Sequence, residues 1–491
     1  MKVMFIRPPE TFIKDPRIGI PVGTLSVAAV LEKAGHEIKV FDSLLYRDKV
    51  DNPLHFGASW QHIEDEIKGF SPDVIGIAGM FSTQAPNAIT LISIAKKVDT
   101  NMKLITGGSH ATVRPTEFLD AGIDMVIVGE GEYAALDIIE YFSGTRELKD
   151  VRGAAYYENG HLKVARREFI KNLDELPIPA YHLVDMEQYF QLVKDGYASR
   201  PLDIFHRPMR EITMITSRGC PFECTFCSIH PTMGYPFRAH SPEYVVNHIQ
   251  HVVEHYGIEL IHFEDDNLTL DPNRFEKILD MLKERNIHVE WDTPNGTRAD
   301  TLSRELLGKM KKMHVRELRI AIESADQQIL NTVIRKDLDL QKVIEVCKNC
   351  FELDVPLSAF YLMGMPGETK EHIQKTLDLA YMLMKNYNVK PHVNIVNPIV
   401  GTELYNMAKR SGYLASDDYT KGGIFSGGRI STEHFTPEYL EEKRKEFYRK
   451  VRRLYVVKML KKPSAISGNI VTMIRYPKST FRLLKTAMQY T

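Results

Sequence analysis

Short apolar segments alternate with amphipathic segments along most of the chain, and this pattern predicts strands followed by helices. In residues 1–145 the helical segments Thr24–Ala34 and Pro86–Val98 lie between apolar runs. Alternation of this kind is typical of a parallel, doubly wound α/β sheet, which binds ligands at the carboxyl ends of its strands. The predicted strands are Lys2–Arg7, Glu37–Asp42, Val74–Met80, Lys103–Gly108 and Met125–Gly129.

A second strand–helix series follows, after a hairpin pattern and the linker-like Leu176-Pro177-Ile178-Pro179. Six parallel strands fall short of the roughly eight of a complete barrel, so we expect a partial (β/α)6 barrel. Its predicted strands are Glu211–Ser217, Leu260–Glu264, Val289–Asp292, Leu318–Glu323, Leu357–Met363 and Val393–Asn397. The expected domains are a doubly wound, Rossmann-like domain at 1–148, a linker with a hairpin at 149–205, the barrel at 206–410 and a basic helical segment at 411–491.

Composition limits the class of protein. The chain has 491 residues, 43% of them hydrophobic and 26% charged, so we expect more than one globular domain. A net charge of −1 gives no reason to expect a nucleic-acid partner. The five cysteines do not suit a disulfide framework. No signal-peptide pattern opens the chain, and no apolar run reaches the roughly 18 residues of a spanning helix, so we expect a cytoplasmic protein without a transmembrane segment.

Three cysteines, Cys220, Cys224 and Cys227, directly follow the first predicted barrel strand with C-x3-C-x2-C spacing. Ordinary iron–sulfur clusters use four thiolates, so three leave one iron open to a ligand. The alternative is zinc with His230 as its fourth ligand. Cys347 and Cys350 lie in a segment of helical pattern, and we interpret them as buried, apolar side chains.

Further motifs end the later barrel strands: Phe263-Glu264-Asp265-Asp266-Asn267, Ile322-Glu323-Ser324, Met363 to Thr369, and Asn397 to Glu403. Together with the cysteine triad, over residues 211 to 405, they resemble the radical S-adenosylmethionine (SAM) superfamily. The resemblance implies a [4Fe–4S] cluster on the three cysteines, whose open iron binds SAM. It also implies SAM contacts from Phe226, Glu323, Ser324, Met363 and Gly364.

The first domain lacks the dinucleotide motif G-x-G-x-x-G, because Pro8 and Pro9 follow its first strand. Its strand ends resemble the cobalamin-binding domain fused to radical SAM barrels. Glycines there let a backbone approach a nucleotide tail closely. The implied cobalamin contacts are Pro8, Met80, Phe81, Ser82, Thr83, Gln84, Gly107, Gly108, Ser109, His110, Gly129, Glu130 and Gly131.

The common cobalamin motif D-x-H-x-x-G is absent from the chain. The resemblance is therefore to proteins that bind cobalamin without a histidine below the cobalt, and it implies that the segment Met80–Gln84 lines the lower face. His110 is expected to contact the nucleotide tail. The alternative is a domain that keeps the fold with an empty site.

The segment Ser431–Thr491 holds 14 Lys and Arg, 5 Glu and no Asp, a charge of 14 − 5 = +9. Leu440, Phe447, Val451, Leu454 and Tyr455 fall at roughly helical spacing among these basic residues. Two interpretations remain open: a docking surface for an acidic protein or an anionic lipid surface, or a structural cap on the barrel.

The resemblance implies a cobalamin-dependent radical SAM C-methyltransferase. In this reaction a 5′-deoxyadenosyl radical abstracts hydrogen from an unactivated sp3 carbon, which then takes a methyl group from methylcobalamin. It also implies a low-potential electron donor of flavodoxin or ferredoxin type. The substrates of relatives include small metabolites, hopanoids, tetrapyrroles and peptides, and the resemblance leaves open a protein residue, such as those in methyl-coenzyme M reductase, or a small molecule. The alternatives are a cyclase or rearranging enzyme with the same cofactors, and a non-catalytic cobalamin-binding sensor.

Overall fold

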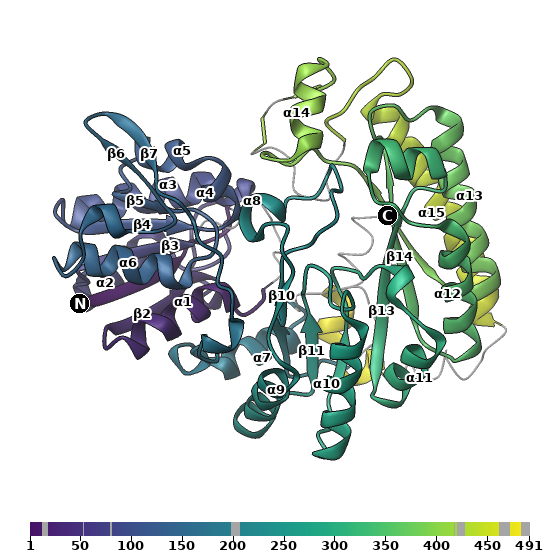
Figure 1. The fold of residues 1–491 in the computed structure, drawn as a ribbon, viewed down its shortest axis with the longest axis horizontal. Coiled ribbons are helices and arrows are strands. Elements are labelled where there is room, and N and C mark those ends of the chain that lie inside the picture. The colour runs from purple at the N-terminus through teal and green to yellow at the C-terminus, as the bar shows by residue number, and fades with distance from the viewer. Residues whose placement is uncertain are drawn as a thin grey trace. The chain divides into compact units, whose positions relative to one another are not determined.

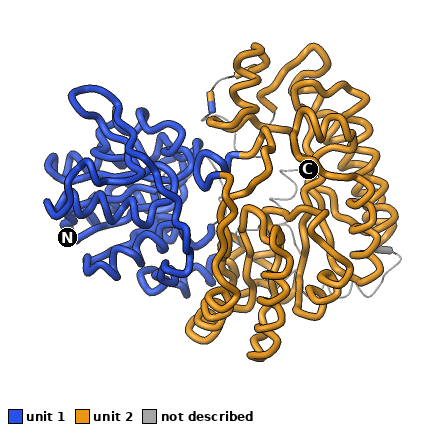
Figure 2. Tube along the Cα trace, viewed as in Figure 1, with its two compact units in different colours: residues 1–192, 228–234, 419–421 blue, residues 193–227, 235–418, 422–491 orange. Residues whose placement is uncertain are grey.

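The computed structural model describes residues 1–11, 18–52, 54–78, 81–197, 207–416, 418–419, 428–460 and 472–482. It divides into two compact units, coloured separately in Figure 2. The first comprises Met1–Leu192, Ser228–Gly234 and Tyr419–Lys421, and the second comprises Val193–Cys227, Tyr235–Asp418 and Gly422–Thr491. Met80 lies outside the described residues. The domain boundaries expected at 148, 205 and 410 stay predictions.

The first unit is built on one seven-stranded sheet, with helices on both of its faces (Figure 1). The strand order is β2-β1-β3-β4-β5-β6-β7, in which β1 to β5 are parallel and β6 and β7 are antiparallel. The strands are β1 (Lys2–Arg7), β2 (Glu37–Asp42), β3 (Val74–Ala78), β4 (Lys103–Gly107), β5 (Met125–Ile127), β6 (Ala154–Glu158) and β7 (His161–Val164). The helices are α1 (Val22–Lys33), α2 (Trp60–Phe70), α3 (Ala85–Val98), α4 (Ser109–Val113), α5 (Pro115–Asp120), α6 (Glu132–Phe142) and α8 (His230–Met233). A further helix, α7 (Met186–Lys194), begins in this unit.

Alternate residues of β1 enter two different cores. Met4 and Ile6 pack with residues of α2, α3 and α5. Val3 and Phe5 pack with residues of α1 and α6 on the other face. Because side chains alternate along a strand, a strand that is apolar at every position buries both faces of its sheet. This explains the continuous apolar runs in the sequence and confirms the doubly wound architecture.

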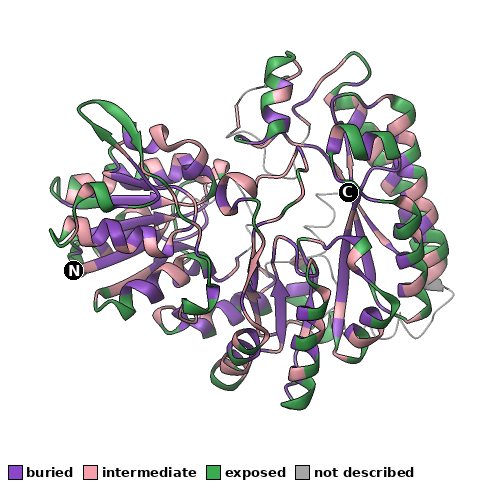
Figure 3. Ribbon diagram, viewed as in Figure 1, coloured by how far each residue is buried: buried purple, intermediate pink, exposed green. Residues whose placement is uncertain are grey.

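The second unit holds six parallel strands in the order β15-β14-β13-β12-β11-β8, which confirms the partial (β/α)6 barrel. Figure 3 shows these strands as largely buried. They are β8 (Glu211–Met214), β11 (Leu260–Phe263), β12 (Glu290–Asp292), β13 (Val315–Glu323), β14 (Leu357–Met363) and β15 (Lys390–Ile395). The helices that begin in this unit are α9 (Pro242–Tyr256), α10 (Pro272–Glu284), α11 (Arg304–Lys312), α12 (Leu340–Glu352), α13 (Lys370–Tyr387), α14 (Glu403–Arg410) and α15 (Pro437–Leu460).

The first predicted barrel strand, Glu211–Ser217, is interrupted. β8 ends at Met214, and Ser217–Arg218 forms β9, which pairs antiparallel with β10 (Arg238–Ala239). This small ribbon lies directly before the cysteine triad in the sequence, so the chain changes direction at the end of the strand.

Helix α15 packs against β15 and α13. Its residues Leu440, Phe447 and Val451 are buried, and the backbone N–H of Val393 on β15 donates to the Tyr448 hydroxyl at 2.9 Å. Leu454 is half-buried and Tyr455 is 51% exposed, so one face of this helix covers the barrel, and docking of a partner on its outer face stays a prediction. In the part of the chain that the structure describes, no helix is long and apolar enough to cross a membrane.

Candidate cofactor sites

The cysteine triad lies in the loop after β9, and its three thiols are half-buried. Thr225, in the middle of the loop, ties it to other barrel segments. Its N–H donates to the Ile334 carbonyl at 3.0 Å, and its hydroxyl donates to the Val333 carbonyl at 2.9 Å. The Thr225 carbonyl in turn accepts from the Leu404 N–H at 2.8 Å. The loop therefore has a defined place in the barrel unit.

The electrostatics of the triad fit a cluster. Burial raises the pKa of the Cys220 and Cys224 thiols, and the cations of Arg298 and Lys336 oppose this shift. Thiolates in such a place need further positive charge, which iron supplies. Within the described ranges, no three His, Cys, Asp or Glu side chains converge as ligands of one metal ion. A [4Fe–4S] cluster binds each thiolate to a different iron and does not require such convergence.

His230, the fourth ligand considered for zinc, lies in the segment Ser228–Gly234 that belongs to the first unit. Cys347 and Cys350 are fully buried on α12, which confirms that they are core side chains. Burial raises the pKa of the Cys350 thiol to about 12 and that of Cys347 further. Both are therefore neutral thiols at physiological pH.

Four of the five residues expected at SAM lie at the carboxyl ends of β13 and β14, and the fifth, Phe226, lies in the cysteine loop. Glu323 follows a register shift in β13, takes φ +71° and forms a buried ion pair with Lys336 at 3.1 Å. The Ser324 hydroxyl accepts from the Asp326 N–H at 3.2 Å. Both side chains thus already have protein partners, and Phe226 is half-buried. Their contacts with SAM stay predictions.

Glu368 belongs to the predicted motif Met363 to Thr369, in which no role was assigned to it, and it holds the segment after β14. Its Oε2 accepts from the N–H groups of Gly364 and Met365 at 2.7 and 2.8 Å. Burial raises the pKa of Glu368 to about 7. The motif Met363 to Thr369 placed Glu368 near the expected site, but an exposed turn would have the same composition, so the sequence did not show what the carboxylate binds. The sequence did not predict Lys336 and Arg298 as residues of the site, because they reach it from other loops.

The strand order places a switch point between β1 and β3, where doubly wound sheets bind ligands. Pro8 and Pro9 follow β1 there, and the Asn87 side chain donates to the Pro9 carbonyl at 2.8 Å. The Gln84 amide donates to the Glu10 carboxylate at 2.5 Å. Phe81 leaves 44% of its surface exposed at this edge. The edge thus offers an apolar ring beside fixed polar groups, which suits the flat, mostly apolar corrin of cobalamin.

His110 is buried and engaged at both ring nitrogens. Its Nδ1 lies 2.9 Å from the Ser82 hydroxyl, and its Nε2 lies 3.1 Å from Glu117 Oε2. The Tyr419 hydroxyl also donates to Glu117, at 2.6 Å. Burial lowers the pKa of His110. A ring held on both sides fits a cobalamin without a histidine ligand.

Protein atoms already explain three of the expected glycines. A Cβ on Gly107 would lie 3.2 Å from Ile127, and one on Gly131 would lie 3.0 Å from Val27. Gly129 has φ +92°, and a Cβ there would lie 3.3 Å from the Thr232 carbonyl of α8. These glycines are required for packing, so their presence is not by itself a mark of a cofactor. Their contacts with cobalamin stay predictions.

The neighbouring Glu130 accepts from the Ile170 N–H at 2.9 Å and lines a cavity of about 310 Å³. Two further expected residues, Gly108 with φ +115° and Ser109, stand at the start of α4. Thr83 lies in the short turn before α3. Those of the expected residues that the structure describes thus lie at or follow the carboxyl ends of four neighbouring parallel strands, β1, β3, β4 and β5.

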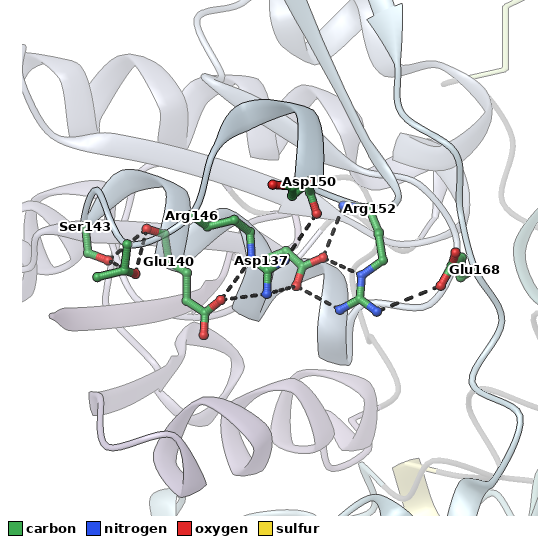
Figure 4. A network of polar contacts seen from close by, with 8 residues as sticks. Asp137, Glu140, Ser143, Arg146, Asp150, Arg152 and Glu168 are labelled. Atoms are coloured by element: carbon green, nitrogen blue, oxygen red, sulfur yellow. Dashed lines mark hydrogen bonds and ion pairs between the residues drawn. The ribbon is translucent and has the colours of Figure 1, made fainter.

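A larger hollow of about 980 Å³ lies elsewhere in the first unit and contains none of the expected site residues. Figure 4 shows the polar network beside it, in which the buried Asp137 binds Arg146 and Arg152. Glu140 pairs with Arg146 and Glu168 with Arg152. The charges in this network satisfy one another, so we interpret it as structural.

Two family models match the chain, the B12 binding domain at residues 12–139 and the Radical SAM superfamily at residues 214–380. The chain is 30% identical to the cytidylyl-2-hydroxyethylphosphonate methyltransferase of Streptomyces wedmorensis, over 85% of this chain and 83% of that protein. It is also 30% identical to an uncharacterised methyltransferase of Pyrococcus horikoshii, over 91% of this chain and 92% of that one.

Among solved structures, the cobalamin-dependent SAM radical enzyme OxsB, with aqua-cobalamin and SAM bound, matches with a TM-score of 0.70 at 17% identity. The match covers 86% of this chain and 63% of OxsB. The radical SAM methyltransferase TsrM from Kitasatospora setae matches with a TM-score of 0.68 at 15% identity, over 84% of this chain and 76% of TsrM. At such identities the likeness establishes the fold.

The chain belongs to the cobalamin-binding radical SAM family. It is a cobalamin-dependent radical SAM methyltransferase whose cofactors are a [4Fe–4S] cluster, SAM and cobalamin.

Proposed function

We propose that the enzyme methylates an unactivated sp3 carbon. The observation that carries the proposal is the pairing, in one chain, of a cobalamin-binding domain with a radical SAM barrel and its cysteine triad. Bound together, the cofactors supply a hydrogen-abstracting radical and a transferable methyl group. The protein's part is to hold both cofactors and to keep water from the reacting carbon.

The residue assignments are part of the proposal. Cys220, Cys224 and Cys227 bind three irons and leave the fourth for SAM. The segment that Glu368 holds after β14 presents its backbone to adenine, and the edge at β1, β3 and β4 receives cobalamin. Because the Ser82 hydroxyl and the His110 ring bind each other, neither side chain would ligate the cobalt.

The substrate class is the finer question. We propose a peptide or protein residue, such as one in methyl-coenzyme M reductase, as the first candidate, because the basic C-terminal segment suits an acidic protein surface. A small molecule is the second candidate, since the Streptomyces relative acts, by its name, on cytidylyl-2-hydroxyethylphosphonate. Turnover of each candidate under identical conditions separates them.

The reaction needs a reductant, and we propose a low-potential donor of flavodoxin or ferredoxin type. We also propose that the enzyme works in the cytoplasm, where low-potential donors are available and the sparse cysteines of the chain remain reduced.

Product analysis tests the proposal. A methyltransferase of this kind uses one SAM as radical source and another as methyl donor. It should therefore form 5′-deoxyadenosine and S-adenosylhomocysteine in about equal amounts, with one methyl group added to the product. A cyclase or rearranging enzyme, the alternative with the same cofactors, would form 5′-deoxyadenosine without matching S-adenosylhomocysteine. A cobalamin sensor would form neither.

A further inference from the structure

Three of the four residues before the first cluster ligand, Thr216, Ser217 and Gly219, are bound by two adjacent carboxylates. Asp265 and Asp266 lie in the loop that follows β11, and β11 is the neighbour of β8 in the sheet. Asp265 Oδ1 accepts from the Thr216 N–H at 3.1 Å, from the Thr216 hydroxyl at 2.7 Å and from the Ser217 hydroxyl at 2.5 Å. Its Oδ2 has no hydrogen-bond partner among the described residues. Every hydrogen bond of this carboxylate within that part of the chain therefore goes to Thr216 and Ser217.

Asp266 binds the next part of the same segment. Its Oδ2 accepts from the Gly219 N–H at 2.7 Å, a length typical of a charge-assisted bond. Gly219 takes φ +81°, a conformation that side chains other than glycine rarely adopt. This turn directs the chain into Cys220, and the Asp266 carboxylate holds the amide that defines it.

Arg274 of α10 completes the enclosure from the other side of the backbone. Its Nη2 donates to the Thr216 carbonyl at 2.9 Å, and its Nε donates to the His240 carbonyl at 2.7 Å. The His240 N–H donates to the same Thr216 carbonyl at 2.9 Å. The segment is thus fixed through both its amide and its carbonyl groups.

Burying carboxylates is costly, so a pair directed at one short segment needs an explanation. Asp265 is only 2% exposed. A radical SAM cluster has one iron without a protein ligand, so the direction of that iron depends on how the cysteine loop is held. Groups that hydrogen-bond to metal ligands, or to the backbone that carries them, commonly control both the affinity for the metal and its redox potential.

We propose that Asp265 and Asp266 are positioning residues for the cluster, acting through the backbone of Thr216–Gly219. They preorganise the loop so that Cys220 enters the cluster in one orientation and the open iron faces SAM. This role does not depend on which substrate the enzyme uses, because SAM must bind the open iron in every reaction of the cluster.

The test compares Asp266→Ala with Asp266→Asn in the full-length, anaerobically reconstituted enzyme. The alanine variant removes the acceptor of the Gly219 N–H, whereas the asparagine variant keeps an oxygen acceptor. We expect Asp266→Ala to lose cluster iron to a chelator roughly tenfold faster or more than the parent. We also expect its reduced cluster to give a broadened electron paramagnetic resonance signal that responds only weakly to SAM. Asp266→Asn should restore both properties.

Asp339→Ala is the matched control, because Asp339 accepts one backbone N–H, from Gln341 at 2.8 Å, at the start of α12. It should leave iron loss and the cluster signal unchanged. Cobalamin content and the thermal transition report on general damage in every variant. Should Asp266→Ala fail to fold, Asp266→Ser replaces it, since its hydroxyl is too short to reach Gly219.

Parent-like iron retention and a parent-like response to SAM in Asp266→Ala, or its serine substitute, would overturn the proposal. So would an asparagine variant as defective as the alanine variant, because the hydrogen bond would then not be what matters. Equal defects in Asp339→Ala would likewise assign the effect to general destabilisation.

Discussion

His262, on β11, is buried between carboxylates of the two neighbouring strands. Its Nδ1 lies 2.7 Å from Asp292 Oδ1, and its Nε2 lies 3.5 Å from Glu211 Oε2. Burial alone would lower the pKa of His262, but these carboxylates outweigh it and raise the pKa to about 9. The ring is therefore charged in the folded barrel at neutral pH, and its charge is part of the barrel's stability.

The sign of the pH dependence follows from this raised pKa. The stabilisation is fully present below pH 6.5, the ordinary pKa, and is lost as the pH rises through about 9. At about 1.4 kcal/mol per unit, the effect is on the order of a few kcal/mol. We expect the denaturation midpoint of the anaerobic holoenzyme to decrease as the pH is raised from neutral to 9. In His262→Gln this decrease with pH should be smaller. An unchanged slope in that variant would refute the assignment.

Cobalt ligation gives a second prediction at this scale. His110 is held by Ser82 and Glu117, so it should not bind cobalt. Electron paramagnetic resonance of bound Co(II) should show no nitrogen splitting from an axial base, and His110→Ala should give the same spectrum. A nitrogen triplet in the parent that disappears in His110→Ala would show that the ring leaves its partners to bind the metal.

At the residue scale, the sequence revealed groups that lie close together along the chain. The cysteine triad is such a group, because one loop carries all its members. Lys336 was not found and Glu368 was found only as a member of a motif, although these residues bind Glu323 and the segment after β14. They reach the site through tertiary packing, which a single sequence does not display.

The elements followed from periodicity where they were long enough to show one. β14 has the predicted bounds Leu357–Met363, and β1 and β2 likewise match. The ribbon of β9 and β10 was missed, because each strand has two residues and no alternation can be seen in so short a run. That ribbon leads into the cysteine loop, so the element that periodicity could not predict lies directly beside the expected cluster site.

Helix α15 offers a prediction about elements. The Leu440 side chain is fully buried and occupies the space beside Gly364, where a Cβ would lie 2.6 Å from it. Leu440→Ala should leave a cavity and destabilise the barrel unit by about 2–5 kcal/mol, measured by chemical denaturation. Tyr455→Ala, on the same helix but 51% exposed, should cost less than about 0.5 kcal/mol. Equal effects would mean that α15 does not cap the barrel.

At the scale of the whole molecule, the chain order and the compact units do not coincide. Ser228–Gly234 directly follows Cys227, yet it belongs to the first unit. There the Arg167 guanidinium donates to the Pro231 carbonyl, and Thr232 packs on Gly129. Sequence reasoning assigned this segment to the barrel, because nothing in the local pattern indicates which core it joins. The end of the cluster loop is thereby continuous with the cobalamin-binding unit.

This connection makes the independence of the two cofactors a question for experiment. The core of the first unit is made by its own sheet and helices, and the cysteines contribute nothing to it. We therefore expect simultaneous replacement of Cys220, Cys224 and Cys227 by Ala to remove about four irons per chain and all SAM cleavage. Cobalamin should stay near one per chain, with an unchanged thermal transition of the first unit. Replacing the buried Cys347 and Cys350 by Ala is the control, and it should leave iron content as in the parent. Loss of cobalamin in the triple variant alone would mean that Ser228–Gly234 keeps its place only when the cluster anchors the loop before it, so that one cofactor prepares the site of the other.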